Sequence, residues 1–173
     1  MPVIIVLVGA SGTGKTSIAG RLHGEKYGWF HGITTTTRPP REGEVDGVDY
    51  HFTDNGGFMA RLAAGEFCET VEQWGYKYGS PAPKDGQDLV VVLDTAGALA
   101  YKNLFGNNVL TVGLICQESV RCSRISGERS HRTEVTCAEL LATCDLVLNT
   151  TRVSVDSLAN TVNALARGWR GAE

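Results

Sequence analysis

Eight residues near the N-terminus have the types and spacing of a phosphate-binding loop. The pattern G-x-x-x-x-G-K-[ST] has four fixed positions, filled here by Gly9, Gly14, Lys15 and Thr16. Small residues between them let the backbone wrap an anion and direct several N–H groups toward it. Lys15 would reach the terminal phosphates of a nucleoside triphosphate, and the Thr16 hydroxyl would coordinate Mg²⁺. The alternative, a glycine-rich turn that binds nothing, explains fewer of these fixed positions.

Two further groups of side chains could bind phosphate or metal. Arg38 and Arg41 stand three apart in a stretch that two prolines keep extended, and Tyr50 lies across a predicted hairpin. They could bracket one phosphate dianion. Asp94 follows the buried run 89–93, and a carboxylate at the end of a parallel strand suits a magnesium shell or a substrate contact. The alternatives are solvated arginines and an aspartate that only caps a strand end.

Strands and helices alternate around these residues. Buried parallel strands are predicted where apolar residues run without alternation, at 3–8, 89–93, 109–116 and 146–148. Helices are predicted at 16–23, 97–104, 119–127 and 134–143, with a last helix capped by Ser154 and packing through Val155, Leu158, Val162 and Leu165. Between the first helix and the second strand we expect a mixed α+β insertion with a helix after Asp54 and strands at 66–71 and 74–78.

This order predicts an α/β fold with a phosphate loop, a central parallel sheet and helices on both faces. The chain has 173 residues, which suits a single domain, 1–173. Its net charge of -3 argues against a nucleic-acid partner, and its apolar runs are too short for a membrane span. Five cysteines without a C-x-x-C pair predict reduced, mostly buried thiols and a cytoplasmic protein. At this point a GTPase, an ATPase and a kinase all remain open.

Residues 34–52, TTTTRPPREGEVDGVDYHF, closely resemble the signature of the guanylate kinases, which move a phosphoryl group from ATP to GMP. The likeness continues through 66–69 and 76–80, and more weakly through 145–149. It implies a P-loop kinase fold whose core is formed by 1–28 and 81–173, with an acceptor-binding insertion at 29–80 and a lid at about 127–134.

The resemblance also implies roles for individual residues. The acceptor phosphate is held at positions that match Arg38, Arg41, Tyr50 and Tyr78. Guanine is read at positions that match Thr34, Glu69 and Ser80, because a carboxylate can accept from the N1–H and N2 amino groups of guanine. The implied ATP site comprises Gly9, Ser11, Gly12, Thr13, Gly14, Lys15, Thr16 and Asn149. The implied catalytic residues are Lys15, Arg38, Asp94, Arg129 and Arg132, with magnesium at Thr16 and Asp94.

Some features depart from the family pattern. Ala96 stands where the family usually carries a second acidic residue, and the stretch from Ser80 to Leu89 is shorter than usual. Arg124 also lies in the segment that matches the lid, whereas Arg121 and His131 are interpreted as surface charges. We expect ATP-dependent phosphorylation of GMP, dGMP or both. A kinase with an altered acceptor and a non-catalytic module that binds phosphorylated peptides are the alternatives, and a homodimer is left open.

Overall fold

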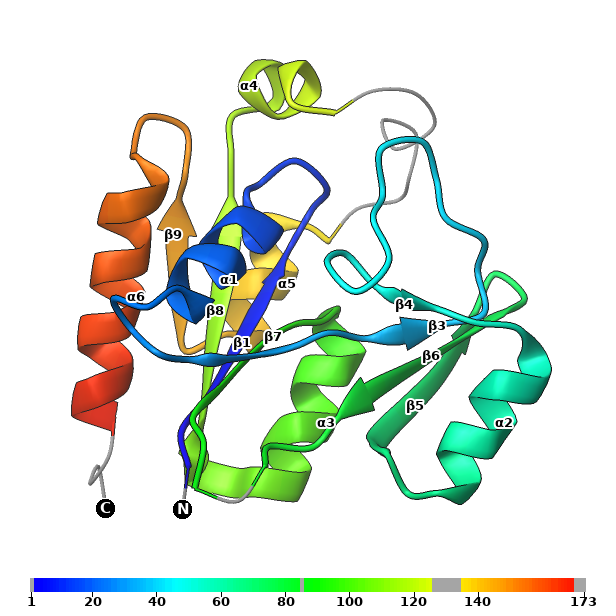
Figure 1. Cartoon of the computed structure of the whole chain (residues 1–173). Helices are drawn as coiled ribbons and strands as arrows, with labels where there is room; N and C mark the ends of the chain where they lie inside the picture. The colour runs from blue at the N-terminus through cyan, green and yellow to red at the C-terminus, as the bar shows by residue number, and fades with distance from the viewer. Residues whose placement is uncertain (1, 85, 126–134, 170–173) are drawn as a thin grey trace.

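Five parallel strands form the central sheet of the protein. The computed structural model describes residues 2–84, 86–125 and 135–169. The strand order in this sheet is β2-β7-β1-β8-β9. The bounds are β1 Ile4–Gly9, β2 Phe30–Gly32, β7 Leu89–Val92, β8 Val109–Ile115 and β9 Leu146–Asn149. All four predicted strands are therefore confirmed, and Figure 1 shows them with their carboxyl ends directed toward the phosphate loop and α4 (Glu118–Ser123).

The fifth strand, β2, comes from the segment that the sequence analysis placed in the insertion. Phe30 pairs with Leu89 of β7, and Gly32 pairs with Val91. The prediction missed this strand because it has only three residues and no apolar run. Glycine fits at position 32 because a Cβ there would lie 2.8 Å from Cδ1 of Leu89. The chain thus leaves the central sheet after Gly32 rather than before Trp29.

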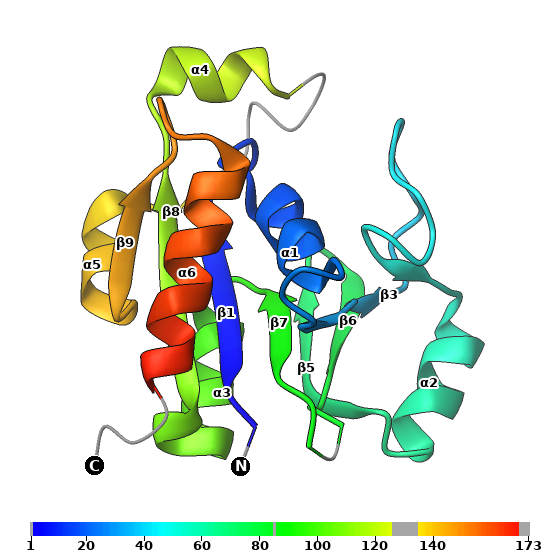
Figure 2. The ribbon, with the colours of Figure 1, turned by 60° about the vertical axis from the view of Figure 1, so that its left-hand side comes forward.

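Helices cover both faces of this sheet, as predicted. The helices α1 (Lys15–His23) and α6 (Val155–Trp169) pack on the face that receives Ile5 and Leu7 of β1. The opposite face receives Ile4 and Val6 and is covered by α3 (Thr95–Phe105) and α5 (Cys137–Thr143). Figure 2 shows α6 and α1 in front of the sheet and α3 and α5 behind it. Burial of each such aliphatic side chain contributes about 2 kcal/mol.

A second sheet of four strands lies beside the central one. Its order is β4-β3-β6-β5, with bounds β3 Thr35–Thr36, β4 His51–Phe52, β5 Phe67–Gln73 and β6 Tyr76–Pro81. The helix α2 (Asn55–Ala63) covers it and is capped by Asp54, as predicted. Only Phe58 of α2 is fully buried, so this small unit packs through few apolar side chains. Trp74, expected in a strand, occupies the turn between β5 and β6 with a φ of 52°.

The remaining elements correct several predicted boundaries. The helix α4 ends at Ser123, and α5 begins at Cys137, where Thr136 forms a capping box with Glu139. A 3₁₀ turn, η1 (Gly106–Asn108), links α3 to β8. Leu165 of α6 was expected to be buried but is 44% exposed. The five cysteines form no disulfide bond with one another, but none of them is fully buried, contrary to the prediction of mostly buried thiols. Among the described residues, no helix has the length and apolar character needed to cross a membrane.

Candidate functional site

A cavity of about 370 Å³ lies between the phosphate loop and the segments on either side of β3. It is lined from the loop and the start of α1 by Ser11, Gly12, Gly14, Lys15, Thr16 and Ser17. From the other side it is lined by Thr34, Arg41, Glu44, Val48, Asp49 and Tyr50. The two groups that the sequence analysis singled out for phosphate binding therefore share one cavity.

The phosphate loop takes its shape from its glycines and from Thr13. Gly12 has a φ of 79° and Gly14 a φ of 96°, which a side chain would strain. The Thr13 hydroxyl is buried and donates to the carbonyl oxygen of Ala10 at 2.8 Å. Lys15 begins α1, and its ammonium donates to the carbonyl oxygens of Gly9 and Ala10 at 2.7 Å each. The helix N-terminus and this ammonium both bring positive potential to the cavity.

The helix α4 packs against the outer side of the loop and carries an arginine that corrects the sequence analysis. Arg121 was interpreted as a surface charge, yet it is only 5% exposed. Its guanidinium donates to both carboxylate oxygens of Glu118, at 2.6 and 2.9 Å, and to the carbonyl oxygen of Ser11 at 3.2 Å. The hydrogen bonds from Arg121, together with one from the Cys122 thiol, lower the pKa of Glu118 to about 2. Arg121 is thus a buried contact between α4 and the loop.

Arg124 stands three residues farther along and lines the cavity. Its guanidinium donates to the carbonyl oxygens of Gly12 at 3.5 Å and of Thr150 at 3.4 Å. Arg129, His131 and Arg132 lie outside the described residues, so their expected roles stay predictions. Of the three arginines in the segment that matches the lid, the structure describes Arg124, and it places this side chain at the phosphate loop.

Arg38, expected to bind the acceptor phosphate, is held by an acid. Its side chain and that of Glu44 are each only 6% exposed, and two hydrogen bonds of 2.9 and 3.0 Å join them. The same carboxylate accepts from the backbone N–H of Arg41 at 2.8 Å. Burial alone would lower the pKa of Arg38, but the hydrogen bonds and charge of Glu44 outweigh burial and raise it. Arg38 is therefore a fully charged guanidinium in a preset orientation.

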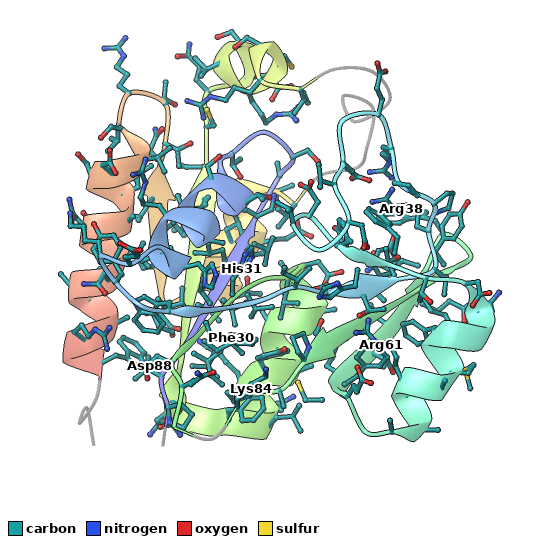
Figure 3. The ribbon with its side chains drawn as sticks, viewed as in Figure 1. Phe30, His31, Arg38, Arg61, Lys84 and Asp88 are labelled. Atoms are coloured by element: carbon teal, nitrogen blue, oxygen red, sulfur yellow. The ribbon has the colours of Figure 1, made fainter. Side chains whose placement is uncertain are left out.

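Two tyrosines complete this cluster. The Arg38 guanidinium lies 5.3 Å from the centre of the Tyr50 ring, and the rings of Tyr50 and Tyr78 meet edge to face at 6.2 Å. Burial raises the pKa of Tyr50, so its hydroxyl stays a hydrogen-bond donor. The structure brings the four expected phosphate ligands together, although only Arg41 and Tyr50 line the cavity among them. Figure 3 shows Arg38 on the side of the four-stranded sheet, with His31 closer to the central sheet.

The three residues expected to read the base come from neighbouring strands. Glu69 of β5 lies opposite Ser80 of β6 and accepts a hydrogen bond from its side chain. Burial raises the pKa of Glu69 above that of an exposed glutamate, and the Ser80 hydrogen bond only partly opposes this effect. Thr34 lines the cavity, whereas Ser80 is buried and, like Glu69, is not among the described residues that line it.

Two further hydrogen bonds, from Tyr101 of α3 and from Cys68 of β5, hold the carboxyl end of β6. The Tyr101 hydroxyl of α3 donates to the carbonyl oxygen of Pro81 at 2.6 Å. The Cys68 thiol donates to the carbonyl oxygen of Ser80 at 3.5 Å. Tyr101 is completely buried, so these contacts fix the end of β6 where the insertion rejoins the core.

Asp94, expected to hold magnesium or to contact a substrate, is the N-cap of α3 in the structure. One carboxylate oxygen accepts from the N–H of Gly97 and caps α3, at 2.8 Å. The other accepts from the side-chain amide of Gln73 at 2.6 Å. Asp94 is not among the described residues that line the cavity. The first turn of α3 leaves N–H groups that need an acceptor, and Asp94 supplies one as a helix cap rather than as the strand-end cap considered from the sequence; its expected magnesium role stays a prediction.

Asn149 lies at a separate hollow of about 610 Å³, together with Cys116, Gln117, Thr151 and Arg152. Its side-chain oxygen accepts from the N–H of Thr151 at 3.0 Å. Arg124 links this hollow to the first cavity, since its guanidinium also lies 3.7 Å from the Cys116 sulfur. The expected ATP-site residues are thus divided between the loop and this hollow.

The cavity also contains polar residues that the sequence analysis did not assign, namely Ser17, His31, Glu44 and Asp49. Burial lowers the pKa of His31, and the neighbouring His23 lowers it further, so this imidazole is neutral near pH 7. Glu44 could have been found from its spacing, because it follows Arg38 by six residues and Arg41 by three in a short charged loop. No pattern in the sequence distinguishes His31.

The lining residues fit a magnesium ion that arrives with nucleotide phosphates. The exposed Thr16 side chain offers one oxygen at the cavity. Across the described ranges, no group of three or more histidine, cysteine or acidic side chains could form a closed metal cage. Mg²⁺ commonly keeps several waters and takes only one or two protein ligands beside phosphate oxygens, so such a cage is not required.

Comparison with known proteins gives concordant matches. The guanylate kinase family profile matches residues 1–87. The guanylate kinase of Carboxydothermus hydrogenoformans is 30% identical over 179 aligned positions, which cover 94% of this chain and 85% of that protein. Those of Symbiobacterium thermophilum and Thermus thermophilus are 39% and 40% identical over 113 positions, 62% of this chain, and 54% and 51% of those proteins. The chain thus spans about half the length of these two curated relatives.

The fold also matches a solved structure. The crystal structure of guanylate kinase from Anaplasma phagocytophilum aligns with a TM-score of 0.72 and 22% sequence identity. The alignment covers 98% of this chain and 87% of that chain. At this level of identity the likeness shows the fold alone, which is the predicted α/β architecture with a central parallel sheet.

Proposed function

The chain belongs to the guanylate kinase family, and on this premise we propose that it transfers the γ-phosphoryl group of ATP to GMP and to dGMP. The products would be ADP and the corresponding diphosphate. The observation that carries the proposal is the shared cavity, which is lined by the phosphate loop on one side and by Arg41, Tyr50 and Thr34 on the other. Phosphoryl transfer depends chiefly on holding donor and acceptor in line and on neutralising charge.

The donor triphosphate would lie in the loop between Gly9 and Thr16. Its backbone N–H groups and the Lys15 ammonium would bind the β- and γ-phosphates. Lys15 now donates to two loop carbonyls, so binding would exchange these acceptors for phosphate oxygens. The adenosine would extend past Arg124 toward the hollow that Asn149 lines. A bound Mg²⁺ at Thr16 would neutralise phosphate charge and help to align the reacting groups.

The acceptor phosphate would meet Arg38, Arg41, Tyr50 and Tyr78. Glu44 already orients the Arg38 guanidinium, which reduces the rearrangement needed when the phosphate binds. The guanine would present its N1–H and N2 amino groups to Glu69, with Thr34 and Ser80 beside O6. A site of this kind rejects a base that leaves its buried polar groups unpaired by about 10⁴-fold in favourable cases. Arg124 joins Arg129 and Arg132 as a candidate for stabilising the transferring group, because it already lines the cavity.

A coupled assay of ADP release tests this proposal. The chain would be offered ATP and Mg²⁺ with GMP, dGMP, AMP, CMP, UMP or dTMP in turn, and we expect rapid turnover with the two guanine nucleotides only. The Lys15→Ala variant should lose at least about 10³-fold in kcat, because it removes the charge next to the transferring phosphate. Lys26→Ala is the matched control, since Lys26 is exposed and bonds only to Asn160 and the Tyr27 ring among the described residues.

The same assay separates the alternatives. Turnover with another monophosphate, and little with GMP or dGMP, would replace the proposal with a kinase of altered acceptor. Absence of turnover with every acceptor, together with GMP binding that Lys15→Ala leaves unchanged, would indicate a non-catalytic binding module.

A further inference from the structure

Arg121 contacts the phosphate loop from outside the cavity. Its guanidinium reaches the carbonyl oxygen of Ser11, while Arg124 on the same side of α4 reaches the carbonyl oxygen of Gly12. Arg121 is not among the described cavity-lining residues, whereas Ser11 and Gly12 are. Two consecutive loop carbonyls are thus held by guanidinium groups, one from α4 and one from Arg124, the residue that follows it.

The geometry of the peptide bond gives these contacts a consequence. In a trans peptide the C=O and the N–H of the same unit point in opposite directions. The Ser11 oxygen shares its peptide unit with the Gly12 N–H, so holding that oxygen on α4 directs the Gly12 N–H away from α4. The Arg124 contact holds the Gly12 oxygen, while the Thr13 N–H of that peptide unit donates to the carbonyl oxygen of Ala10 at 3.4 Å. Loop N–H groups that converge on one point form the anion site of such a loop.

We propose that Arg121 is a positioning residue for the donor phosphates, because it fixes the peptide between Ser11 and Gly12 with the Gly12 N–H facing the anion. This inference rests on the proposed use of the loop for ATP. It adds a residue for which the family resemblance implied no role and which sequence analysis interpreted as a surface charge.

Three further observations indicate that Arg121 is held firmly against the phosphate loop. Both carboxylate oxygens of Glu118 accept from Arg121, so the guanidinium has a fixed orientation. A Cβ on Gly12 would lie 2.9 Å from the Arg121 carbonyl oxygen and 3.2 Å from its Cγ, so backbone and side chain of α4 press closely on the loop. Gly12 has a φ of 79°, a conformation that needs outside support because glycine is otherwise flexible.

The test compares ATP affinity with GMP affinity in Arg121→Gln. Without the guanidinium the Ser11–Gly12 peptide can rotate, and the expected result is a rise of about tenfold in the calorimetric Kd for ATP and in KM for ATP. The KM for GMP and kcat at saturating ATP should change by less than about twofold, because the lost contact is equally present in ground state and transition state. Arg121→Lys keeps one charged donor and should recover part of the ATP affinity.

Two control variants separate positioning from stability. Glu118→Gln keeps Arg121 but weakens the ion pair that orients it, so a smaller rise in KM for ATP is expected. Arg21→Gln removes an exposed guanidinium of α1, paired with Asp156 at 3.1 Å, and should leave both KM values unchanged. A merely structural role for Arg121 would instead lower the melting temperature of Arg121→Gln and leave the two KM values in their wild-type ratio.

The outcomes are distinguishable from those of the proposed function. An unchanged Kd for ATP in folded Arg121→Gln overturns the positioning role and leaves the kinase proposal intact. Wild-type protein that binds ATP but phosphorylates neither GMP nor dGMP overturns the kinase proposal, and the calorimetric comparison still decides the role of Arg121. Wild-type protein that does not bind ATP overturns both.

Discussion

Replacing Glu44 with alanine tests how much its carboxylate contributes to stability by pairing with the buried Arg38 guanidinium. Glu44 is the acid that holds Arg38, and both side chains are 6% exposed. Removing one partner of a buried ion pair leaves an uncompensated charge, which typically costs about 3–5 kcal/mol. The pair adjoins a cavity that water can enter, so we expect the lower end, about 3 kcal/mol. For a chain of this length, that loss corresponds to a melting temperature lower by about 10 °C.

GMP should counteract part of this loss. Its phosphate dianion would supply the negative charge that Glu44→Ala lacks, so saturating GMP should raise the melting temperature more in the variant than in the wild type. The measurement is thermal unfolding, followed by circular dichroism, with and without GMP. Glu42→Ala is the matched control, because Glu42 is an exposed acid in the same loop. Its melting temperature should stay near that of the wild type.

A double variant tests whether the pair serves binding rather than stability. Arg38→Met with Glu44→Leu replaces the ion pair with apolar side chains, and such replacements are often neutral or stabilising. We expect this variant to recover most of the stability but to bind GMP at least about 100-fold more weakly, since it lacks a charged phosphate ligand. The reasoning is refuted if Glu44→Ala loses less than about 1 kcal/mol, or if GMP stabilises it no more than the wild type.

Two other predictions concern Glu69 of β5 and Tyr101 of α3. Glu69 must be ionised to accept from guanine, and burial raises its pKa in the folded protein. The KM for GMP should therefore rise as pH falls, and the rise should begin at a higher pH than an exposed glutamate would give. The Glu69→Gln variant should lose this pH dependence. A KM for GMP that stays constant between about pH 8 and pH 5 in the wild type would contradict the prediction. Tyr101→Phe removes the buried donor to the Pro81 carbonyl and should cost about 1–3 kcal/mol in urea unfolding. The exposed hydrogen bond of Tyr27 to Asn160 provides the comparison, because Tyr27→Phe should cost less than about 0.5 kcal/mol.

The parts of the fold that the sequence predicted are those with a strong local signal. Strands β1 and β7 are unbroken apolar runs, because both their faces are buried under helices. The phosphate loop was recognisable because its conformation requires glycines at set positions. By contrast, β2 is a strand because residues 30–32 pair with β7. The segment itself has neither an apolar run nor an alternation of polar and apolar residues that would predict a strand. A short edge strand of this kind is decided by tertiary pairing.

The sequence singled out candidate ligands of the site but not the side chains that hold them in the structure. Arg38 and Arg41 followed from spacing and from the family resemblance, whereas the spacing of Glu44 from these arginines was not interpreted as an ion pair with Arg38. Arg121 was misinterpreted because a charged residue on a short helix gives no sign that the helix will pack on a loop far away in sequence. Asp94 was expected at the metal because strand ends often carry ligands, whereas here the start of α3 uses that carboxylate as a cap.

The cations of this site share one physical feature, which bears on how nucleotides would bind. Arg38 is held by Glu44, Arg121 by Glu118, and Lys15 by two loop carbonyls. Glu44 and Glu118 each fix the direction of a guanidinium and leave room in the cavity for a phosphate. Arg38 and Arg121 can therefore keep these partners when a phosphate binds. Lys15 is different, because it lines the cavity and is the cation expected to bind the phosphates, whereas Arg121 reaches the Ser11 carbonyl from outside the cavity. Its ammonium would therefore change partners on binding, and this exchange would make Lys15, rather than Arg38 or Arg121, the cation whose contacts differ most between the free and the nucleotide-bound protein.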